Sequence, residues 1–174
     1  MRLLVFIALL FGLMACGSVD IEEYQDSGPE LVLSRFFEGE LKAYGMVQDY
    51  QGLVTRRFVV TMTGTWQDGV GILDEDFVYD DGETQKRIWT LTELGNGAYQ
   101  GRADDIIGVA SGQAVGSALR WRYDMLLPVD GQEYQVHFDD WMYLIDDTTL
   151  INKSDIIKFG VTVATVTLVI QKQG

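Results

Sequence analysis

The stretch SALRWRYDMLL, residues 117–127, alternates between apolar and charged side chains over most of its length. Arg120, Arg122 and Asp124 occupy one set of alternate positions. The other set is apolar and consists of Leu119, Trp121, Tyr123, Met125 and Leu127. Because successive side chains of a strand point to opposite faces, this alternation predicts a β-strand with one face buried in a core.

Similar segments recur along the chain and are separated by turn signals. Residues 57–66 alternate in the same way, with Phe58 and Val60 on the apolar side and Arg57 on the polar side. Asp-Gly and Asn-Gly pairs between such segments supply the positive φ angles that tight hairpins require. Together with other turn signals, such as DYQG (49–52), SGQAVGS (111–117) and DDTT (146–149), these pairs divide the chain into ten candidate strands: 39–48, 53–66, 70–79, 84–93, 98–103, 105–112, 117–127, 132–145, 148–157 and 160–171. No helix of ten or more residues is predicted, and residues 30–37 fit either a short helix or a strand.

A series of antiparallel strands with short connections is typical of an up-and-down barrel or of a sandwich. The absence of long connections favours the barrel, of a lipocalin- or calycin-like kind with about 8–10 strands. We expect it to occupy residues 31–174 as one domain, since a chain of 174 residues that is 47% hydrophobic can form one sizeable core. A barrel of this size has an interior wide enough for one small ligand.

The chain begins MRLLVFIALLFGLMACGS, with one positive charge before an apolar run that is too short to span a membrane comfortably. Leu13 to Cys16 resembles the lipobox of bacterial lipoproteins, in which the cysteine carries diacylglycerol and acyl chains such as palmitate. We therefore predict a signal peptide over residues 1–15 and a lipidated Cys16; the alternative is a buried N-terminal helix. Gly17 is compatible with sorting to the outer membrane, and the acidic residues 16–30 are predicted to be a flexible tether.

Charge and residue counts exclude several classes of function. The chain has 26 acidic and 13 basic residues, a net charge of −13, so nucleic-acid binding is not expected. A single histidine, His137, and a single cysteine do not suffice for a His/Cys zinc site, and residues 74–83 do not match a calcium-binding loop. No nucleophile motif accompanies His137, and Asp139 and Asp140 would point to opposite faces of a strand. We predict no metal, no cofactor and no enzymatic activity.

Four longer runs lie in a fixed order behind Cys16: DFVYDDGETQKRIWTL (76–91), LRWRYDMLLPVDG (119–131), HFDDWMYLID (137–146) and LINKSDIIKFG (150–160). Together they resemble the bacterial lipoproteins of domain-of-unknown-function family 3833, over roughly residues 31–172. The resemblance implies a lipocalin-like protein of the Gram-negative envelope, with no established activity. Genes of this family often adjoin genes for fatty-acid or phospholipid modification, which hints at lipid chemistry.

Several charged and aromatic residues share strand faces and are candidates for binding a ligand inside the barrel. An arginine that points inward could hold a carboxylate or phosphate. The candidates are Arg87, Trp89, Arg120, Arg122, Asp139, Trp141 and Tyr143. The alternative is that the charges face water and the aromatic rings cover the ends of the barrel.

The leading functional hypothesis is an envelope lipoprotein that binds a fatty acid or another lipid in its barrel. It would be attached through Cys16 to a membrane, expected to be the outer membrane, and would face the periplasm. The alternatives are a filled barrel that docks to an envelope protein, whose identity the sequence does not indicate, and, last, a lipid-modifying enzyme.

Overall fold

The computed structural model describes residues 19–129 and 131–174. The predicted signal peptide (1–15) and Cys16 lie outside the described residues. Among those described, no helix is long and apolar enough to cross a membrane.

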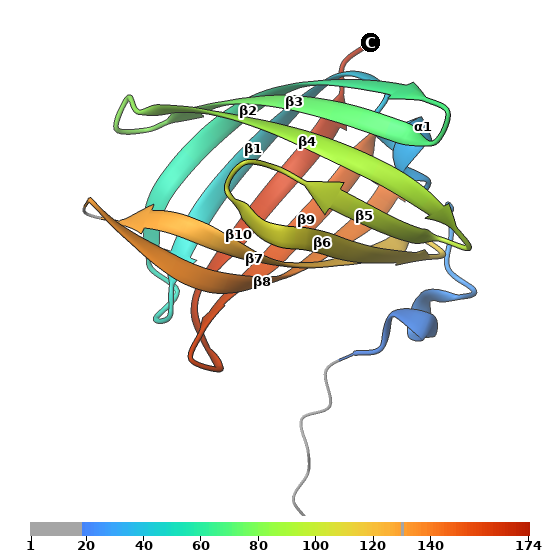
Figure 1. Cartoon of the computed structure of the whole chain (residues 1–174). Coiled ribbons are helices and arrows are strands. Elements are labelled where there is room, and N and C mark those ends of the chain that lie inside the picture. The colour runs from blue at the N-terminus through green and yellow to red at the C-terminus, as the bar shows by residue number, and fades with distance from the viewer. Residues whose placement is uncertain (1–18, 130) are drawn as a thin grey trace, which may run out of the picture.

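Ten antiparallel strands form a closed barrel in which each strand pairs with its neighbours in sequence (Figure 1). The barrel closes where β1 pairs with β10. The all-β up-and-down barrel predicted from the sequence is confirmed. The strands are β1 (Gly39–Asp49), β2 (Val54–Gln67), β3 (Val70–Tyr79), β4 (Thr84–Gly95), β5 (Ala98–Arg102), β6 (Ile106–Val115), β7 (Ala118–Val129), β8 (Gln132–Asp146), β9 (Thr149–Lys158) and β10 (Val161–Lys172).

The short helix α1 (Leu33–Phe36) closes one end of the barrel. Leu33, Phe36 and Phe37 are each at most 4% exposed and belong to the central core. The Lys172 ammonium of β10 donates hydrogen bonds to the backbone oxygens of Arg35 (3.1 Å) and Phe36 (2.9 Å), at the end of α1. Residues 30–37 therefore form a short helix rather than a strand, and it is fixed to the last strand.

The other end carries the β1–β2, β3–β4, β7–β8 and β9–β10 turns, and we call it the open end. The wall is incomplete near this end, because β5 is short and pairs with β4 only from Thr90 onward. Residues 84–89 of β4 therefore have a strand neighbour only on the β3 side.

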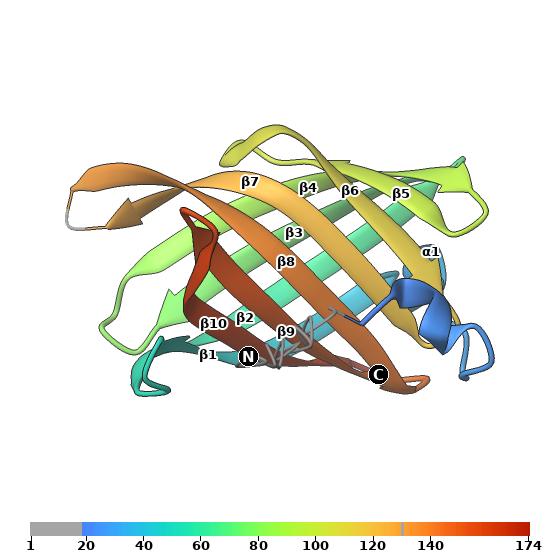
Figure 2. The same ribbon diagram turned by 90° about the horizontal axis from the view of Figure 1, so that it is seen from below.

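Residues 20–30, which belong to the segment predicted to be a flexible tether (16–30), follow the outer surface of the barrel (Figure 2). The 3₁₀-helix η1 (Ile21–Tyr24) places the Tyr24 ring 5.9 Å from Trp141 and 5.8 Å from Tyr143. The Ser27 hydroxyl lies 2.9 Å from the Ser117 hydroxyl and accepts the Ser117 backbone N–H at the same distance. Aromatic contacts and these hydrogen bonds thus hold this acidic segment against the outer face of the barrel, although its sequence shows no periodicity.

Candidate ligand-binding site

The barrel encloses a cavity of about 860 Å³. Leu33 and Phe37 form its floor, and Asp81, Val129 and Gly131 line it at the open end. The five apolar residues that the alternation of 117–127 placed on one face all line this cavity. The inward faces of the strands therefore make a deep, largely apolar cup.

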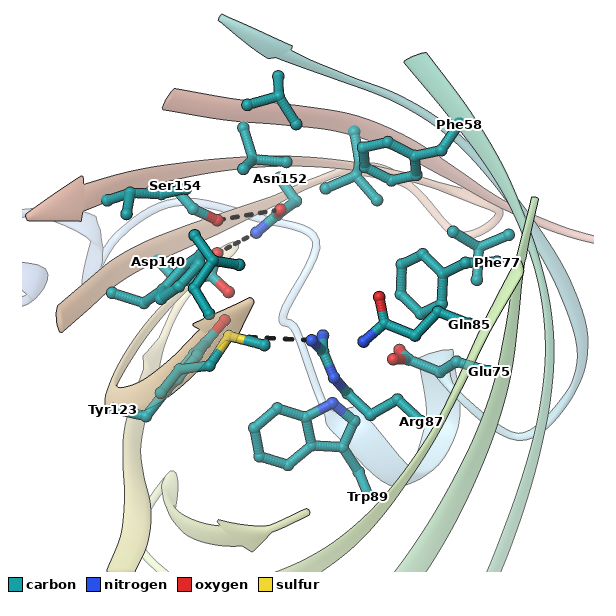
Figure 3. Close-up of a pocket in the computed structure, with 18 of the residues that line it drawn as sticks. Phe58, Glu75, Phe77, Gln85, Arg87, Trp89, Tyr123, Asp140, Asn152 and Ser154 are labelled. Carbon is teal, nitrogen blue, oxygen red and sulfur yellow. Dashed lines mark hydrogen bonds between the residues drawn. The ribbon is translucent and has the colours of Figure 1, made fainter. Parts of the chain in front are cut away.

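A charged cluster interrupts the apolar wall on β3 and β4 (Figure 3). Glu75 and Arg87 are paired in register and both line the cavity. Arg87 donates from Nε (2.9 Å) and Nη2 (2.7 Å) to Oδ2 of Asp105, which reaches it from the β5–β6 turn across the incomplete wall. The other Asp105 oxygen is buried without a hydrogen-bond partner among the described residues. One edge of the guanidinium is therefore occupied, while its end points into the cavity near Met125 Sδ at 3.9 Å.

Burial shifts the pKa values of this cluster. Loss of hydration raises the pKa of the Glu75 carboxyl to about 7; the positive charge of Arg87 opposes the rise, and nearby carboxylates such as Asp105 add to it. Burial acts against the charge of Arg87, but Glu75 and Asp105 outweigh it and leave the pKa of Arg87 raised. Near neutral pH, Glu75 can therefore be either a hydrogen-bond donor or a negative charge, beside a permanent cation.

A second polar group lies on β8 and β9, across the cavity. Asp140, Asn152 and Ser154 are at most 6% exposed and line the cavity. The Asn152 amide donates to Asp140 and to the backbone oxygen of Trp141 (3.2 Å), and Ser154 donates to Asn152 (3.4 Å). Burial raises the pKa of Asp140 to about 6, against the hydrogen bonds from its neighbours. The cavity is thus apolar with two polar groups on facing walls.

Arg56 stands at the mouth. Its Nη2 lies 3.1 Å from the Asp81 carboxylate and also contacts Glu83, and its guanidinium is 3.5 Å from the centre of the Tyr79 ring. These residues rim the cavity on the β3–β4 side. A charged, aromatic rim therefore borders part of the entrance.

Of the seven binding residues predicted from the sequence, Arg87 and Trp89 line the cavity. The other five lie on β7 and β8 and are absent from its lining: Arg120, Arg122, Asp139, Trp141 and Tyr143. Their positions alternate with those of the buried residues of the same strands, so they face outward, and a ligand in the barrel would not reach them. This corrects the expectation for those five.

The outward position of these residues has a physical explanation. Arg120 donates to Asp139 from Nε (2.8 Å) and Nη2 (2.6 Å). The Trp141 and Tyr143 rings are stacked 6.1 Å apart beneath Tyr24. They form the surface on which η1 packs, which explains aromatic side chains on the outside of the barrel.

The remaining candidates for chemistry also lie on the outer face. His137 Nδ1 is 2.9 Å from an oxygen of Asp124. Lys86 is 2.6 Å from Asp74 and 3.1 Å from Asp76. Within residues 19–129 and 131–174, no group of three or more His, Cys, Asp or Glu side chains could hold a metal ion.

Sequence reasoning missed inward polar residues on β3, β4, β8 and β9, and Gln85 of β4 is one of them. Glu75, Asp140, Asn152 and Ser154 occupy the phase of their strands that is otherwise apolar. A polar residue at an apolar position of a regular alternation was the available signal, because a buried polar group needs a partner or a ligand.

The family assignment follows from the sequence as a whole. The model of the family described as a protein of unknown function, DUF3833, matches residues 10–172. The chain belongs to this family. No curated protein matches the chain in sequence.

Among solved structures, this DUF3833 barrel is similar to the S-type phycobiliprotein lyase CPES from Guillardia theta. The TM-score is 0.57 at 7% sequence identity, and the match covers 79% of this chain and 89% of the lyase chain. At this identity the similarity shows the fold, a lipocalin-like barrel, and does not assign an activity to the DUF3833 protein.

Proposed function

We propose that the protein binds an amphipathic ligand with an acidic head group, such as a fatty acid, inside its barrel. The observation that carries the proposal is the cavity of about 860 Å³, which is apolar at its floor and has Arg87 and Glu75 on its wall. Ligand sites in proteins typically have volumes of about 300–1,000 Å³, with a few polar groups on apolar walls. A barrel filled by side chains would instead have favoured a docking module.

The polar cluster suggests how a head group would be held. Asp105 occupies one edge of the Arg87 guanidinium, which leaves its end for an anionic oxygen of the ligand. When Glu75 is protonated, its carboxyl can donate a second hydrogen bond to the same head group. When Glu75 is ionised, its charge repels the head group, so binding of an acid is expected to weaken as the pH rises through about 7. A basic head group would show the opposite dependence.

The test uses two tryptophan substitutions at adjacent positions on β10. Val166 lines the cavity, whereas Thr167 is absent from its lining and lies at the alternate position, on the outer face. Val166→Trp places an indole in the ligand's volume, and we expect it to weaken binding of a fluorescent fatty-acid analogue at least tenfold. Thr167→Trp is the matched control and should bind as the wild type does. Equal binding by both variants, with near-ultraviolet circular dichroism confirming that both are folded, would contradict a ligand in this cavity.

We further propose that the chain is an envelope lipoprotein attached through Cys16 and that its role is binding rather than catalysis. The lipobox resemblance supports the attachment. Cys16→Ser should abolish incorporation of labelled palmitate and leave an uncleaved precursor in the host; unchanged labelling would refute lipidation at this residue. Gentle extraction of the native protein followed by mass spectrometry would identify a bound lipid, and repeated extraction without one would favour a module that docks to another protein.

A further inference from the structure

Two adjacent hairpins at the open end expose large apolar side chains. Tyr50 and Leu53 lie in the β1–β2 turn, and Phe159 and Val161 lie at the β9–β10 turn; we call these four residues the hydrophobic tips. Their exposed fractions are 75%, 66%, 94% and 61%, the highest of any large hydrophobic residues in the described part of the chain. Large apolar side chains that gather on neighbouring hairpins and are this exposed are candidates for an interaction site.

The two hairpins lie side by side at the mouth of the cavity. β1 pairs with β10, and Asp49, at the end of β1, is opposite Ala164, near the start of β10. Thr55 and Arg56 follow the β1–β2 turn and line the cavity. The hydrophobic tips are therefore continuous with the entrance.

Phe159 has a backbone conformation that is unfavourable for its residue type. Three two-residue turns of the barrel have the form X-Gly with both φ angles positive: Asp68-Gly69, Asn96-Gly97 and Phe159-Gly160. The first two use Asp and Asn, the residues that tolerate this conformation best after glycine. Phe159 has a φ of 52°. Since the side chain is almost fully exposed, no packing within the barrel offsets this strain, and the folded domain itself gains little from a phenylalanine here.

The residues around the hydrophobic tips are those typical of a membrane interface. The Lys158 ammonium lies 3.7 Å from the centre of the Tyr134 ring and 5.5 Å from that of Phe159. Aromatic rings and lysines with apolar stems favour the boundary between headgroups and acyl chains. With a net charge of −13, the chain gains little from anionic headgroups, so apolar insertion rather than electrostatic attraction would hold it there.

We propose that the hydrophobic tips insert into the apolar layer of a lipid bilayer and bring the open end of the barrel to the membrane. In Figure 1 the β1–β2 hairpin, the β9–β10 hairpin and η1 lie on the same, lower side of the barrel, and Figure 2 shows that side facing the viewer. If the chain is attached to a membrane at a point N-terminal to η1, both hairpins can therefore face the surface of that membrane. Two protruding tips suit insertion into lipid better than a flat protein interface. The inference goes beyond the proposed ligand binding and does not depend on it.

The test compares two single-tryptophan additions in the full chain, mixed with vesicles of phosphatidylcholine and phosphatidylethanolamine that contain brominated phosphatidylcholine. Phe159→Trp places the reporter at a tip, and Asn96→Trp places it in the equivalent turn at the opposite end of the barrel. The four native tryptophans also emit, so the spectrum of the wild-type chain, measured under the same conditions, is subtracted from that of each variant. Flotation first establishes that each protein is on the vesicles.

We expect the emission added by Phe159→Trp to shift to shorter wavelength and to be quenched at least twofold more by bromine than that added by Asn96→Trp. Failure of the proteins to float, or equal quenching of the two reporters, would overturn the proposal. An unquenched Phe159→Trp on floated protein would assign the hydrophobic tips to a protein partner or to water instead.

Discussion

Replacing Glu75 by glutamine tests the electrostatics of the cavity, because it keeps the size of the side chain and removes its titration. The pKa of Glu75 is raised from 4.5 to about 7, mainly by burial. Below pH 4.5 the carboxyl is protonated in both the folded and the unfolded chain and has no effect on the balance between them. Between pH 4.5 and about 7 the unfolded chain loses the proton first, so the wild-type free energy of unfolding falls as the pH rises. Above pH 7 this loss is complete.

The rise from 4.5 to about 7 corresponds to at most about 3.4 kcal/mol, at 1.36 kcal/mol for each pH unit. Water that reaches the carboxyl through the cavity screens its charge, so we expect about 1–3 kcal/mol. Glutamine does not ionise, so the Glu75→Gln variant does not lose this free energy of unfolding as the pH rises. It should therefore unfold at higher denaturant concentration than the wild type at pH 8, and the advantage should shrink as the pH falls toward 4.5.

The assay is urea unfolding followed by tryptophan fluorescence at several pH values from 4.5 to 8.5. Asp76→Asn is the matched control, since Asp76 is the next residue of β3 and lies on the outer face beside Lys86. It removes a carboxylate of the same strand without touching the cavity. A Glu75→Gln advantage that is the same at every pH, or a variant less stable than the wild type at pH 8, would refute the reasoning.

Three further outcomes are expected. Binding of a fluorescent fatty-acid analogue to the wild type should weaken several-fold between pH 6 and pH 8, as fluorescence titration would show, and should weaken less in Glu75→Gln, in which Asp140 on the facing wall still titrates in this range; an equal or stronger pH dependence in Glu75→Gln would contradict the role given to Glu75. Gly112→Ala should lower the free energy of unfolding by about 1–3 kcal/mol in urea, because its Cβ would lie 1.9 Å from the Trp121 ring; no change would mean that the indole moves aside at little cost. Phe159→Asn should raise the free energy of unfolding by about 1 kcal/mol, since asparagine tolerates the φ of 52° in this turn, and a less stable variant would show that the phenylalanine contributes to folding after all.

The strands were predictable because their signal is local. The alternation in residues 117–127 and the Asp-Gly and Asn-Gly pairs determine face and turn position from neighbouring residues alone, and the observed strands follow the predicted ones closely. The sequence could not decide whether residues 30–37 form a helix or a strand. The helix α1 is held by hydrogen bonds from Lys172, which lies 136 or more residues further along the chain.

The site was predictable only in part. The inward position of Arg87 and Trp89 was predicted correctly because they share the apolar phase of β4. Trp141 and Tyr143 were misplaced because their aromatic character suggested the interior, whereas their phase on β8 put them outside, under η1. The ion pair between Arg87 and Asp105 joins residues 18 positions apart across an incomplete wall. Strand periodicity does not predict such a pair.

The contact between Lys172 and α1 bears on the order in which the molecule assembles. The floor of the cup is fastened by a residue of β10, and the circumference closes only when β1 meets β10. Contacts between residues so far apart in sequence form late in folding, because long loops must first be closed. A chain that has formed only its local hairpins is thus an open sheet with an exposed apolar face and no interior. We therefore expect the cavity to form only when β1 pairs with β10, so that a ligand can be retained only after the two ends of the sheet have joined.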